Sequence, residues 1–241
     1  MMDAASFTRC TLTTDQARAD DEVYGALADA TVDLADAKLR TKLDHDEVRA
    51  IVEVIRDLTE RLGAKAIEGA FGTQLGPGRE VRNHGNAVCG LRNPLASMRR
   101  RDLVITEDGH VHREVELGAL YEGLPGLVHG GVSAALLDQI VGEAAAYSHG
   151  PAVTARLDLH YRMPTPLGPL SLESWTESSE GRKTVTRGVL RDADGNTTVE
   201  AEALMIRPRW TADLPDWESS FRPAETTDPP EGDETAVPSS Q

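Results

Sequence analysis

The chain has 241 residues with 40 acidic and 25 basic side chains, which gives a net charge of −15 at pH 7. No basic stripe stands out against this acidic background, so the composition argues against a nucleic-acid partner. No long uninterrupted apolar run is present, and the N-terminus lacks a basic region followed by an apolar stretch. We therefore expect a cytoplasmic protein without a membrane partner. The two distant cysteines, Cys10 and Cys89, predict neither a disulfide framework nor a thiolate zinc site.

Two helices are predicted in an N-terminal extension that comprises residues 1–68. Residues 15–40 carry apolar side chains at helical spacing, and a second helix is expected from the N-cap Asp44 to the stop at Gly63. The clearer apolar pattern belongs to the second helix and consists of Val48, Ile51, Val52, Ile55, Leu58 and Leu62. We expect the extension to serve in packing or oligomerisation, and a lid over a ligand pocket is the alternative.

Two further segments are predicted to lack regular structure. Residues 69–94 are rich in Gly, Pro, Asn and polar side chains, which is typical of an irregular linker. Residues 210–241 are acidic and rich in proline, a composition that cannot offset the entropy lost on ordering. We expect a disordered C-terminal tail.

The main domain is predicted over residues 95–209. Its expected strands are 103–106, 111–117, 152–163, 169–178, 183–192 and 197–207, and a largely buried helix covers 130–147. Asp108-Gly109 and Asp194-Gly195 mark two hairpin turns. The order of two strands, one helix and four strands favours the α+β class and a hotdog fold, in which a curved antiparallel sheet wraps around one central helix.

Chemistry is predicted at the start of the buried helix. The run Tyr121-Glu122-Gly123-Leu124-Pro125-Gly126-Leu127-Val128-His129-Gly130-Gly131 leads directly into it. The first amides of a helix have no intrahelical acceptor, so the N–H of Gly130 or Gly131 could polarise a carbonyl oxygen. Asp138 is a carboxylate among apolar residues of the same helix, which requires a partner or a purpose.

Asp138 and Gly130 cannot act on one carbonyl within a single chain. Eight residues of helix separate them by ~12 Å at a rise of ~1.5 Å per residue. If two such helices lie antiparallel across a two-fold axis, Asp138 of one subunit approaches Gly130 of the other. The spacing therefore favours a homodimer with two equivalent sites, and pairing of dimers into a tetramer is left open.

From about Asn93 to Arg209 the sequence resembles the PaaI-like branch of the hotdog thioesterase superfamily. The resemblance rests on Asn93-Pro94-Leu95-Ala96, the run from Tyr121 to Gly131, Leu136-Leu137-Asp138, and Thr154-Ala155-Arg156-Leu157-Asp158-Leu159-His160-Tyr161-Arg162-Met163-Pro164. It implies hydrolysis of an acyl-coenzyme A thioester, with Asp138 as the catalytic carboxylate and the Gly130 amide as the oxyanion donor. It also implies that His129 orients the turn and that Thr154 helps to position water. Many relatives carry an Asn where this sequence has Gly123.

The remaining candidates concern substrate contacts. We expect Gly123 and Gly131 beside the substrate, and the basic residues proposed near the coenzyme phosphates are Arg156, Arg162, Arg182 and Lys183. The histidines 110, 112, 149 and 160 lack helical ligand spacing, although the first two share a strand face, so we expect no metal and no cofactor.

Two other functions are weighed against hydrolysis. A non-catalytic acyl-coenzyme A or fatty-acyl binding module would use the same pocket, but it gains nothing from the Asp138 carboxylate. A hotdog hydratase combines an Asp and a His around an Asn-Pro pair, and Asn93-Pro94 lacks those neighbours. For the hydrolase, the sequence leaves open whether Asp138 activates water or attacks the thioester directly.

Overall fold

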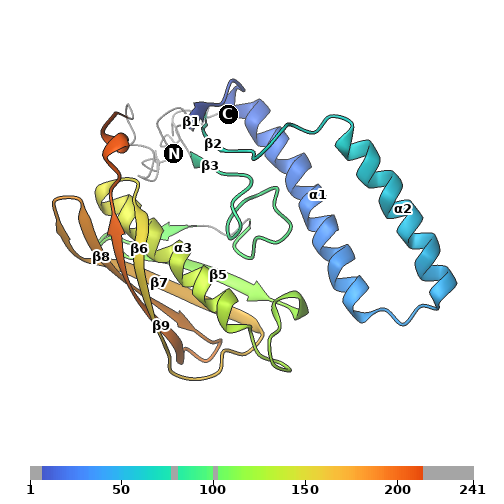
Figure 1. The fold of residues 1–241 in the computed structure, drawn as a ribbon. Helices are drawn as coiled ribbons and strands as arrows, with labels where there is room; N and C mark the ends of the chain where they lie inside the picture. Colours follow the sequence, from blue (N-terminus) through green and yellow to red (C-terminus); the bar gives the residue numbers. More distant parts are fainter. Residues whose placement is uncertain (1–6, 77–80, 100–102, 214–241) are drawn as a thin grey trace, which may run out of the picture.

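The computed structural model describes residues 7–76, 81–99 and 103–213. A six-stranded antiparallel sheet of order β4-β5-β7-β8-β9-β6 curves around one long helix, α3 (Figure 1). The elements are β4 (Val104–Ile105), β5 (Val111–Leu117), α3 (Gly130–His149), β6 (Val153–Tyr161), β7 (Gly168–Glu180), β8 (Lys183–Arg191) and β9 (Thr197–Ile206). The predicted α+β hotdog architecture is confirmed, with strand and helix bounds within three residues of those expected.

The core lies between α3 and the concave face of the sheet. Leu136, Leu137 and Ile140 of the helix have no exposed surface. On β5, Val111 and Val115 point toward the helix, because alternate residues of a strand face opposite sides of the sheet. The helix approaches β8 so closely that a Cβ at Gly188 would lie 2.9 Å from Cγ1 of Val141.

The two N-terminal helices, α1 (Thr14–Arg40) and α2 (His45–Gly63), form a hairpin beside the sheet and helix α3 (Figure 1). Both predicted helices are confirmed. Each begins with a capping box, in which Thr13 exchanges hydrogen bonds with Gln16 and Asp44 does so with Glu47. The side-chain oxygen at the cap satisfies an amide that has no acceptor inside the helix.

Helix α1 contacts the rest of the molecule through small and charged residues. Its buried residues are Ala17, Gly25 and Ala28, and the apolar side chains that suggested the helix are largely exposed, including Val23 at 68%. Ion pairs connect α1 to the segment that precedes the large sheet: Asp21 to Arg82, Asp20 to Arg92, and Asp29 to Arg99. Charge, together with small residues that permit close approach, therefore holds this helix in place.

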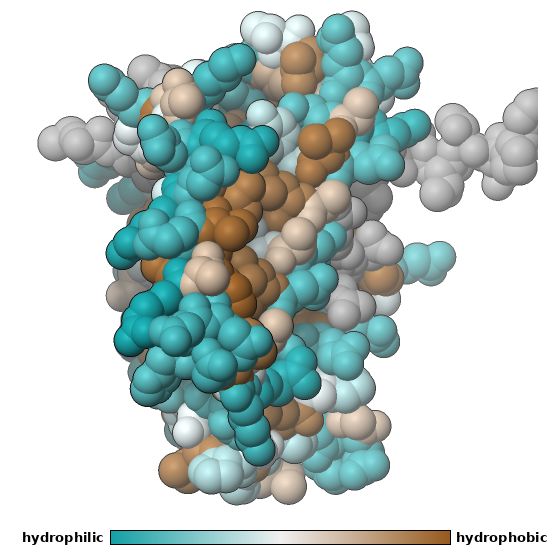
Figure 2. Space-filling model, turned by 90° about the vertical axis from the view of Figure 1, so that its right-hand side faces the viewer, coloured by the Kyte–Doolittle hydropathy of each residue, from teal (hydrophilic) through white to brown (hydrophobic). Residues whose placement is uncertain are grey.

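Helix α2 has no buried residue. Its apolar stripe, Val48, Ile51, Val52, Ile55, Leu58 and Leu62, is 37% to 60% exposed. Figure 2, which views the molecule from the side of α2, shows an apolar band between hydrophilic margins. Within the described ranges, no helix is both long and apolar enough to cross a membrane.

The prediction of an irregular linker over residues 69–94 is wrong in part. This segment contains β2 (Thr73–Leu75) and β3 (Val81–Arg82), which form a three-stranded sheet with β1 (Phe7–Arg9). Farther along, Val88 and Cys89 pack against the core of the large sheet. The described residues of this segment are therefore part of the folded body, and β2 is ordered by pairing with β1, which is distant in sequence.

The first residues of the expected disordered tail are ordered instead. Residues Arg209–Asp213 form a short 3-10 helix, in which the Thr211 hydroxyl donates to the Pro208 carbonyl at 2.7 Å. Thr211 is 2% exposed, so this turn is anchored to the domain. The rest of the predicted tail, residues 214–241, lies outside the described residues.

Candidate active site

The turn before α3 is held by backbone and side-chain hydrogen bonds around His129. The His129 N–H donates to the carbonyl of Tyr121, which ends a short 3-10 helix (Ala119–Tyr121), at 2.9 Å. The His129 Nδ1 accepts from the N–H of Gly131 at 3.0 Å, so His129 is the N-cap of α3. A neutral imidazole that accepts through Nδ1 carries its proton on Nε2. Burial raises the pKa of Tyr121 beside this turn.

Gly130 is the first residue of α3, where the helix dipole is positive. Among the described residues, its N–H has no hydrogen-bond acceptor, as expected for a first-turn amide. Its carbonyl accepts a hydrogen bond of 2.8 Å from the hydroxyl of Tyr161 at the end of β6. This arrangement leaves the Gly130 amide free to donate to a bound oxygen atom.

Gly123 is required by a close backbone approach. Its N–H donates to the carbonyl of Leu127 at 2.9 Å, and a Cβ at this position would lie 2.8 Å from Cα of His129. Contacts under 3.0 Å are not tolerated by real Cβ atoms. An Asn at this position would therefore displace the turn that positions His129.

A cavity of about 720 Å³ opens at this end of α3. Its walls come from the turn, the first helical residues and the end of β6, and they comprise Gly123, Leu124, Leu127, Val128, His129, Gly130, Ser133, Tyr161, Arg162, Met163, Pro164 and Thr165. Apolar walls with a few polar groups suit an organic ligand with one polarised bond. Within one chain, the structure thus brings together four of the predicted residues: Gly123, His129, Gly130 and Arg162.

Asp138 lies farther along α3 and does not line this cavity. The carboxylate is half-buried and its Oδ1 accepts a hydrogen bond of 2.8 Å from the hydroxyl of Thr154 on β6. Two of the predicted site residues, one on a strand and one on the helix, are therefore in contact although 16 positions separate them in the sequence. The helical rise places Asp138 at ~12 Å from Gly130 of the same chain.

The predicted basic residues are dispersed. Arg162 lines the cavity, and its guanidinium donates to Glu200 at 2.6 and 3.0 Å. This hydrogen bond lowers the pKa of the Glu200 carboxyl. Arg156 forms ion pairs with Asp158 at 2.8 Å and Glu202 at 3.4 Å. Both arginines are exposed, but each is already beside a carboxylate.

Arg182 and Lys183 lie at the turn between β7 and β8, at the other end of the sheet from the cavity. Lys183 pairs with Ile206 in the ladder, whereas the cavity residue Tyr161 pairs with Val199 at the far end of β9. The Arg182 guanidinium donates to the carbonyl of Arg207 at 3.0 Å. Within one chain, these two residues are not near Gly130.

Sequence reasoning assigned no role to Tyr161, although this residue both lines the cavity and fixes the Gly130 carbonyl. Ser133 and Thr165 are further polar residues of the wall. A signal for Tyr161 was present, because it stands in the same run as Thr154. Its contact with Gly130 depends on the pairing of β6 with the sheet and could not be read from local sequence.

Comparisons with known proteins agree with the fold and the turn. Residues 125–199 match the family described as the thioesterase superfamily. Acyl-coenzyme A thioesterase THEM4 of Xenopus laevis is 39% identical over 92 residues, which cover 37% of this chain and 41% of the relative. The Mus musculus protein is 37% identical over 92 residues, which cover 37% of this chain and 40% of the relative. The match thus spans about two fifths of these curated relatives.

A solved structure gives broader coverage. The crystal structure of a thioesterase superfamily protein is 35% identical, has a TM-score of 0.68, and is matched over 76% of this chain and 90% of that chain. The match extends well beyond the residues that resemble the curated relatives. The agreement in fold, in sequence and over nearly the whole of that protein shows that this chain belongs to the thioesterase superfamily.

Proposed function

We propose that the protein hydrolyses acyl-coenzyme A thioesters in a site shared between the two subunits of a homodimer. The observation that carries the proposal is the free N–H of Gly130 at the positive end of α3, open to a cavity that could hold the acyl carbonyl. Membership of the thioesterase superfamily and the resemblance to acyl-coenzyme A thioesterases support the same reaction. A carboxylate is still needed, and none of the described residues that line the cavity supplies one.

The carboxylate would come from the partner subunit. Asp138 is ~12 Å along α3 from Gly130, so a two-fold axis that sets two copies of α3 antiparallel would bring Asp138 of one copy to Gly130 of the other. Each dimer would hold two equivalent sites. The hydroxyl of Thr154 would accompany Asp138 into the shared site, because the two side chains are hydrogen-bonded.

Strand β6 supports this mode of dimerisation. It is an edge strand of nine residues that pairs only with β9 and has no fully buried residue. Val153 is 46% exposed and Tyr161 is 55% exposed. Long edge strands with apolar side chains are normally covered in native proteins. Pairing of β6 with a second copy would cover this edge and continue the sheet across the subunits.

In the proposed reaction, Asp138 acts as a general base. It takes a proton from water while the water oxygen attacks the thioester carbonyl, whose oxygen accepts from the Gly130 N–H. The tetrahedral intermediate collapses, the carbon–sulfur bond breaks, and coenzyme A leaves as a stable thiolate that then takes up a proton. Thr154 donates to Oδ1 of Asp138, which leaves Oδ2 available to the water.

Direct attack by Asp138 would instead form a mixed anhydride. A single turnover in ¹⁸O-water reveals an anhydride that water opens at the Asp138 carbonyl, because the label then enters Asp138 and not the released acid. We expect the label in the released acid and none in the Asp138 carboxyl group, measured by mass spectrometry of the peptide. Label in that carboxyl group would establish the anhydride route.

The N-terminal hairpin is proposed to serve in oligomerisation. The apolar stripe of α2 is uncovered in the single chain, and apolar stripes of this kind are normally buried against another surface (Figure 2). A second contact through α2 would join dimers into larger assemblies. Analytical ultracentrifugation of the full chain and of a Val52→Glu, Ile55→Glu variant tests this role, and equal masses would exclude it.

The function is tested by thiol release from short, medium, long and aromatic acyl-coenzyme A esters. We expect Asp138→Asn to lower kcat by about 10²–10⁴-fold. Asp194→Asn, an exposed hairpin carboxylate, is the matched control and should retain wild-type turnover. Tight ligand binding without hydrolysis by the wild type would support the binding module instead.

Subunit complementation tests the shared site. Gly130→Pro removes the amide proton at the first helical position, where proline is tolerated. The extended conformation of His129, φ −61° and ψ 131°, also suits a following proline. Equal mixing of unfolded Asp138→Asn and Gly130→Pro chains, followed by refolding, should restore about a quarter of the sites, since half of the dimers are mixed and each has one intact site. No recovery would place both groups in one chain.

A further inference from the structure

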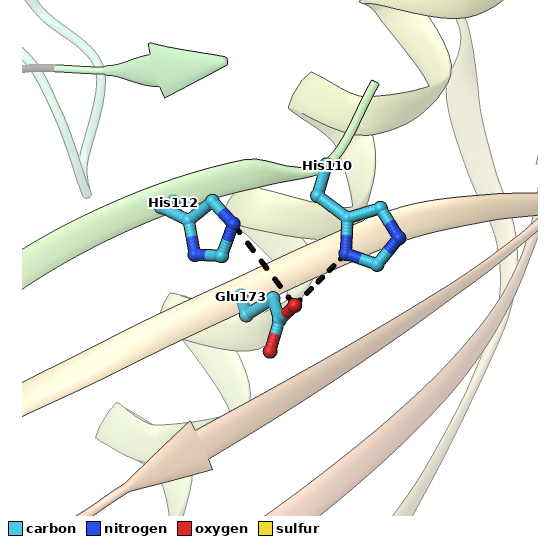
Figure 3. Close-up of side chains that lie close together, drawn as sticks. All are labelled: His110, His112 and Glu173. Atoms are coloured by element: carbon cyan, nitrogen blue, oxygen red, sulfur yellow. Dashed lines mark hydrogen bonds and ion pairs between the residues drawn. The ribbon is translucent and has the colours of Figure 1, made fainter. Parts of the chain in front are cut away.

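We propose that His110, His112 and Glu173 form a binding site for a divalent transition-metal ion, with Zn²⁺ as the best-suited ion, on the outer face of the sheet (Figure 3). Each residue offers one ligand atom, and these atoms lie within 4.8 Å of one another. The cluster is half-buried, so an ion can reach it from solvent. It is independent of the proposed hydrolytic site.

Strand pairing brings the three side chains together. His112 lies directly opposite Glu173 in the antiparallel ladder between β5 and β7. His110 is two residues before His112, so both imidazoles emerge on the same face. The intervening Val111 and the neighbouring Ser174 are completely buried on the other face, where the Ser174 hydroxyl donates to the carbonyl of Ile140 in α3. The cluster therefore faces away from the helix.

The distances suit a metal ion after small side-chain movements. Oε1 of Glu173 is 2.8 Å from Nδ1 of His110 and 4.0 Å from Nε2 of His112. Figure 3 shows both rings directed toward this oxygen. Zn²⁺ binds imidazole nitrogen and carboxylate oxygen at about 2.0–2.2 Å, which places tetrahedral ligand atoms roughly 3.3 Å apart. The His110–Glu173 distance must therefore lengthen and the His112–Glu173 distance shorten, each by less than about 1 Å. The two imidazole nitrogens are within 4.8 Å of each other and must also approach that spacing.

Neighbouring residues hold the ligands in orientation. The His110 ring stacks on Trp175, with centroids 5.3 Å apart and planes at 13°. Arg191 donates to Oε2 of Glu173 at 2.8 Å, which leaves Oε1 for the ion. Nε2 of His110 lies 3.9 Å from a carboxylate oxygen of Asp108, which is beyond hydrogen-bond distance. The negative charge of this carboxylate would still favour the tautomer with the proton on Nε2 and leave Nδ1 for the ion.

The ligand set indicates the class of ion. Two imidazoles and one carboxylate favour Zn²⁺ and its first-row neighbours over Ca²⁺ or Mg²⁺, which prefer oxygen ligands. Water would complete the coordination. Because the ligands come from two strands, a bound ion would fasten the edge formed by β4 and β5 to β7. Fastening of this edge is the role that we assign to the ion.

A second group of potential metal ligands is less suited to hold an ion. Asp20, Asp21 and His84 also approach one another. Arg82 forms ion pairs with both carboxylates and Arg92 forms a further one with Asp20, so two guanidinium groups already take the place of a cation. At the His110 cluster the arginine that the structure describes beside Glu173 is Arg191, which contacts the far oxygen of the carboxylate. That difference favours the outer face of the sheet as the metal site.

The test is Zn²⁺ titration of the full chain without an affinity tag, after removal of metals with a chelator and dialysis. Calorimetry should find one ion per chain, and His112→Ala should weaken its affinity at least about tenfold. Glu173→Gln, which keeps the size of the side chain, should do the same. His45→Ala alters an exposed histidine on α2 and is the matched control.

Two further readouts distinguish a built site from surface binding. Co²⁺ should produce a visible absorption band that is lost in His112→Ala, and Zn²⁺ should raise the Tm of the wild type but not of Glu173→Gln. Thioester hydrolysis is not expected to follow metal content, so this proposal and the proposed function fail separately. Absence of Zn²⁺ binding, or equal binding by the wild type and both variants, would overturn it.

Discussion

The hydroxyl of Thr154 donates a hydrogen bond of 2.8 Å to Oδ1 of Asp138, which joins the edge strand β6 to the buried helix α3. This contact orients the carboxylate and supplies a hydroxyl beside it. We expect Thr154→Val to lower kcat about tenfold, the equivalent of one hydrogen bond in the transition state. Thr154→Ser keeps the hydroxyl and should remain near wild type. Equal kcat values for the valine variant and the wild type would show that Thr154 takes no part in the reaction.

Tyr161 is expected to position the oxyanion amide through its hydrogen bond to the Gly130 carbonyl. Tyr161→Phe removes only the hydroxyl, so the free energy of unfolding should fall by about 0.5 kcal/mol, as for a partly exposed hydrogen bond. The first turn of α3 would lose an anchor, and kcat should fall more than KM changes. Urea unfolding and steady-state kinetics measure the two effects. A change in KM alone would assign Tyr161 to substrate binding.

His84 makes the stability depend on pH. Its pKa is lowered from 6.5, chiefly by burial and then by the charge of Arg92, while the carboxylate of Asp21 opposes the shift. Well above pH 6.5 the imidazole is neutral in both the folded and the unfolded state, and its contribution to the free energy of unfolding is complete. As the pH falls below this value, the unfolded chain takes up a proton that folded His84 does not, so stability is lost until the pH reaches the folded-state pKa.

Thermal unfolding between pH 7.5 and 5 measures this effect. The Tm of the wild type should fall with decreasing pH more steeply than that of His84→Gln, which cannot take up the proton. His45→Gln alters an exposed histidine and should keep the wild-type slope. Parallel curves for the wild type and His84→Gln would show that His84 does not titrate differently in the two states.

The two cysteines should differ in reactivity. Burial, reinforced by the negative charge of Glu143, raises the pKa of the Cys89 thiol to about 11. At pH 8 only about one thiol in a thousand is then ionised, and the thiolate is the reactive form. In the native protein we expect iodoacetamide to modify Cys10 well before Cys89, as followed by peptide mass spectrometry. In urea the rates should converge, and equal native rates would contradict the assignment.

Most of the large domain could be predicted from local sequence, because its pattern is strongly periodic. The helix around Leu136 and Ile140 is apolar on nearly every face, and Asp108-Gly109 and Asp194-Gly195 have the composition of tight turns. Gly109 and Gly195 indeed adopt φ of 82° and 84°. These features depend on residues that are close together in the chain.

Features that depend on distant pairing could not be predicted. Strand β2 pairs in parallel with β1, so that Thr73 lies opposite Phe7, and each strand has only three residues. No periodic pattern exists at that length. The same holds for Glu173, whose proximity to His110 follows from the register of β5 on β7. Local sequence placed His110 and His112 on one strand face but led us to expect no metal, because Glu173 comes beside them only through this pairing.

The close contact between α3 and β8 limits where a fatty chain can go. At Gly188 even a methyl group would press against Val141, and Ala144, Ala145 and Ala203 in the same layer have no exposed surface. The space between helix and sheet is thus already filled. If the protein hydrolyses acyl-coenzyme A as proposed, a long acyl chain would leave the cavity past the end of β6, and the partner subunit across that edge would then set the longest chain that fits.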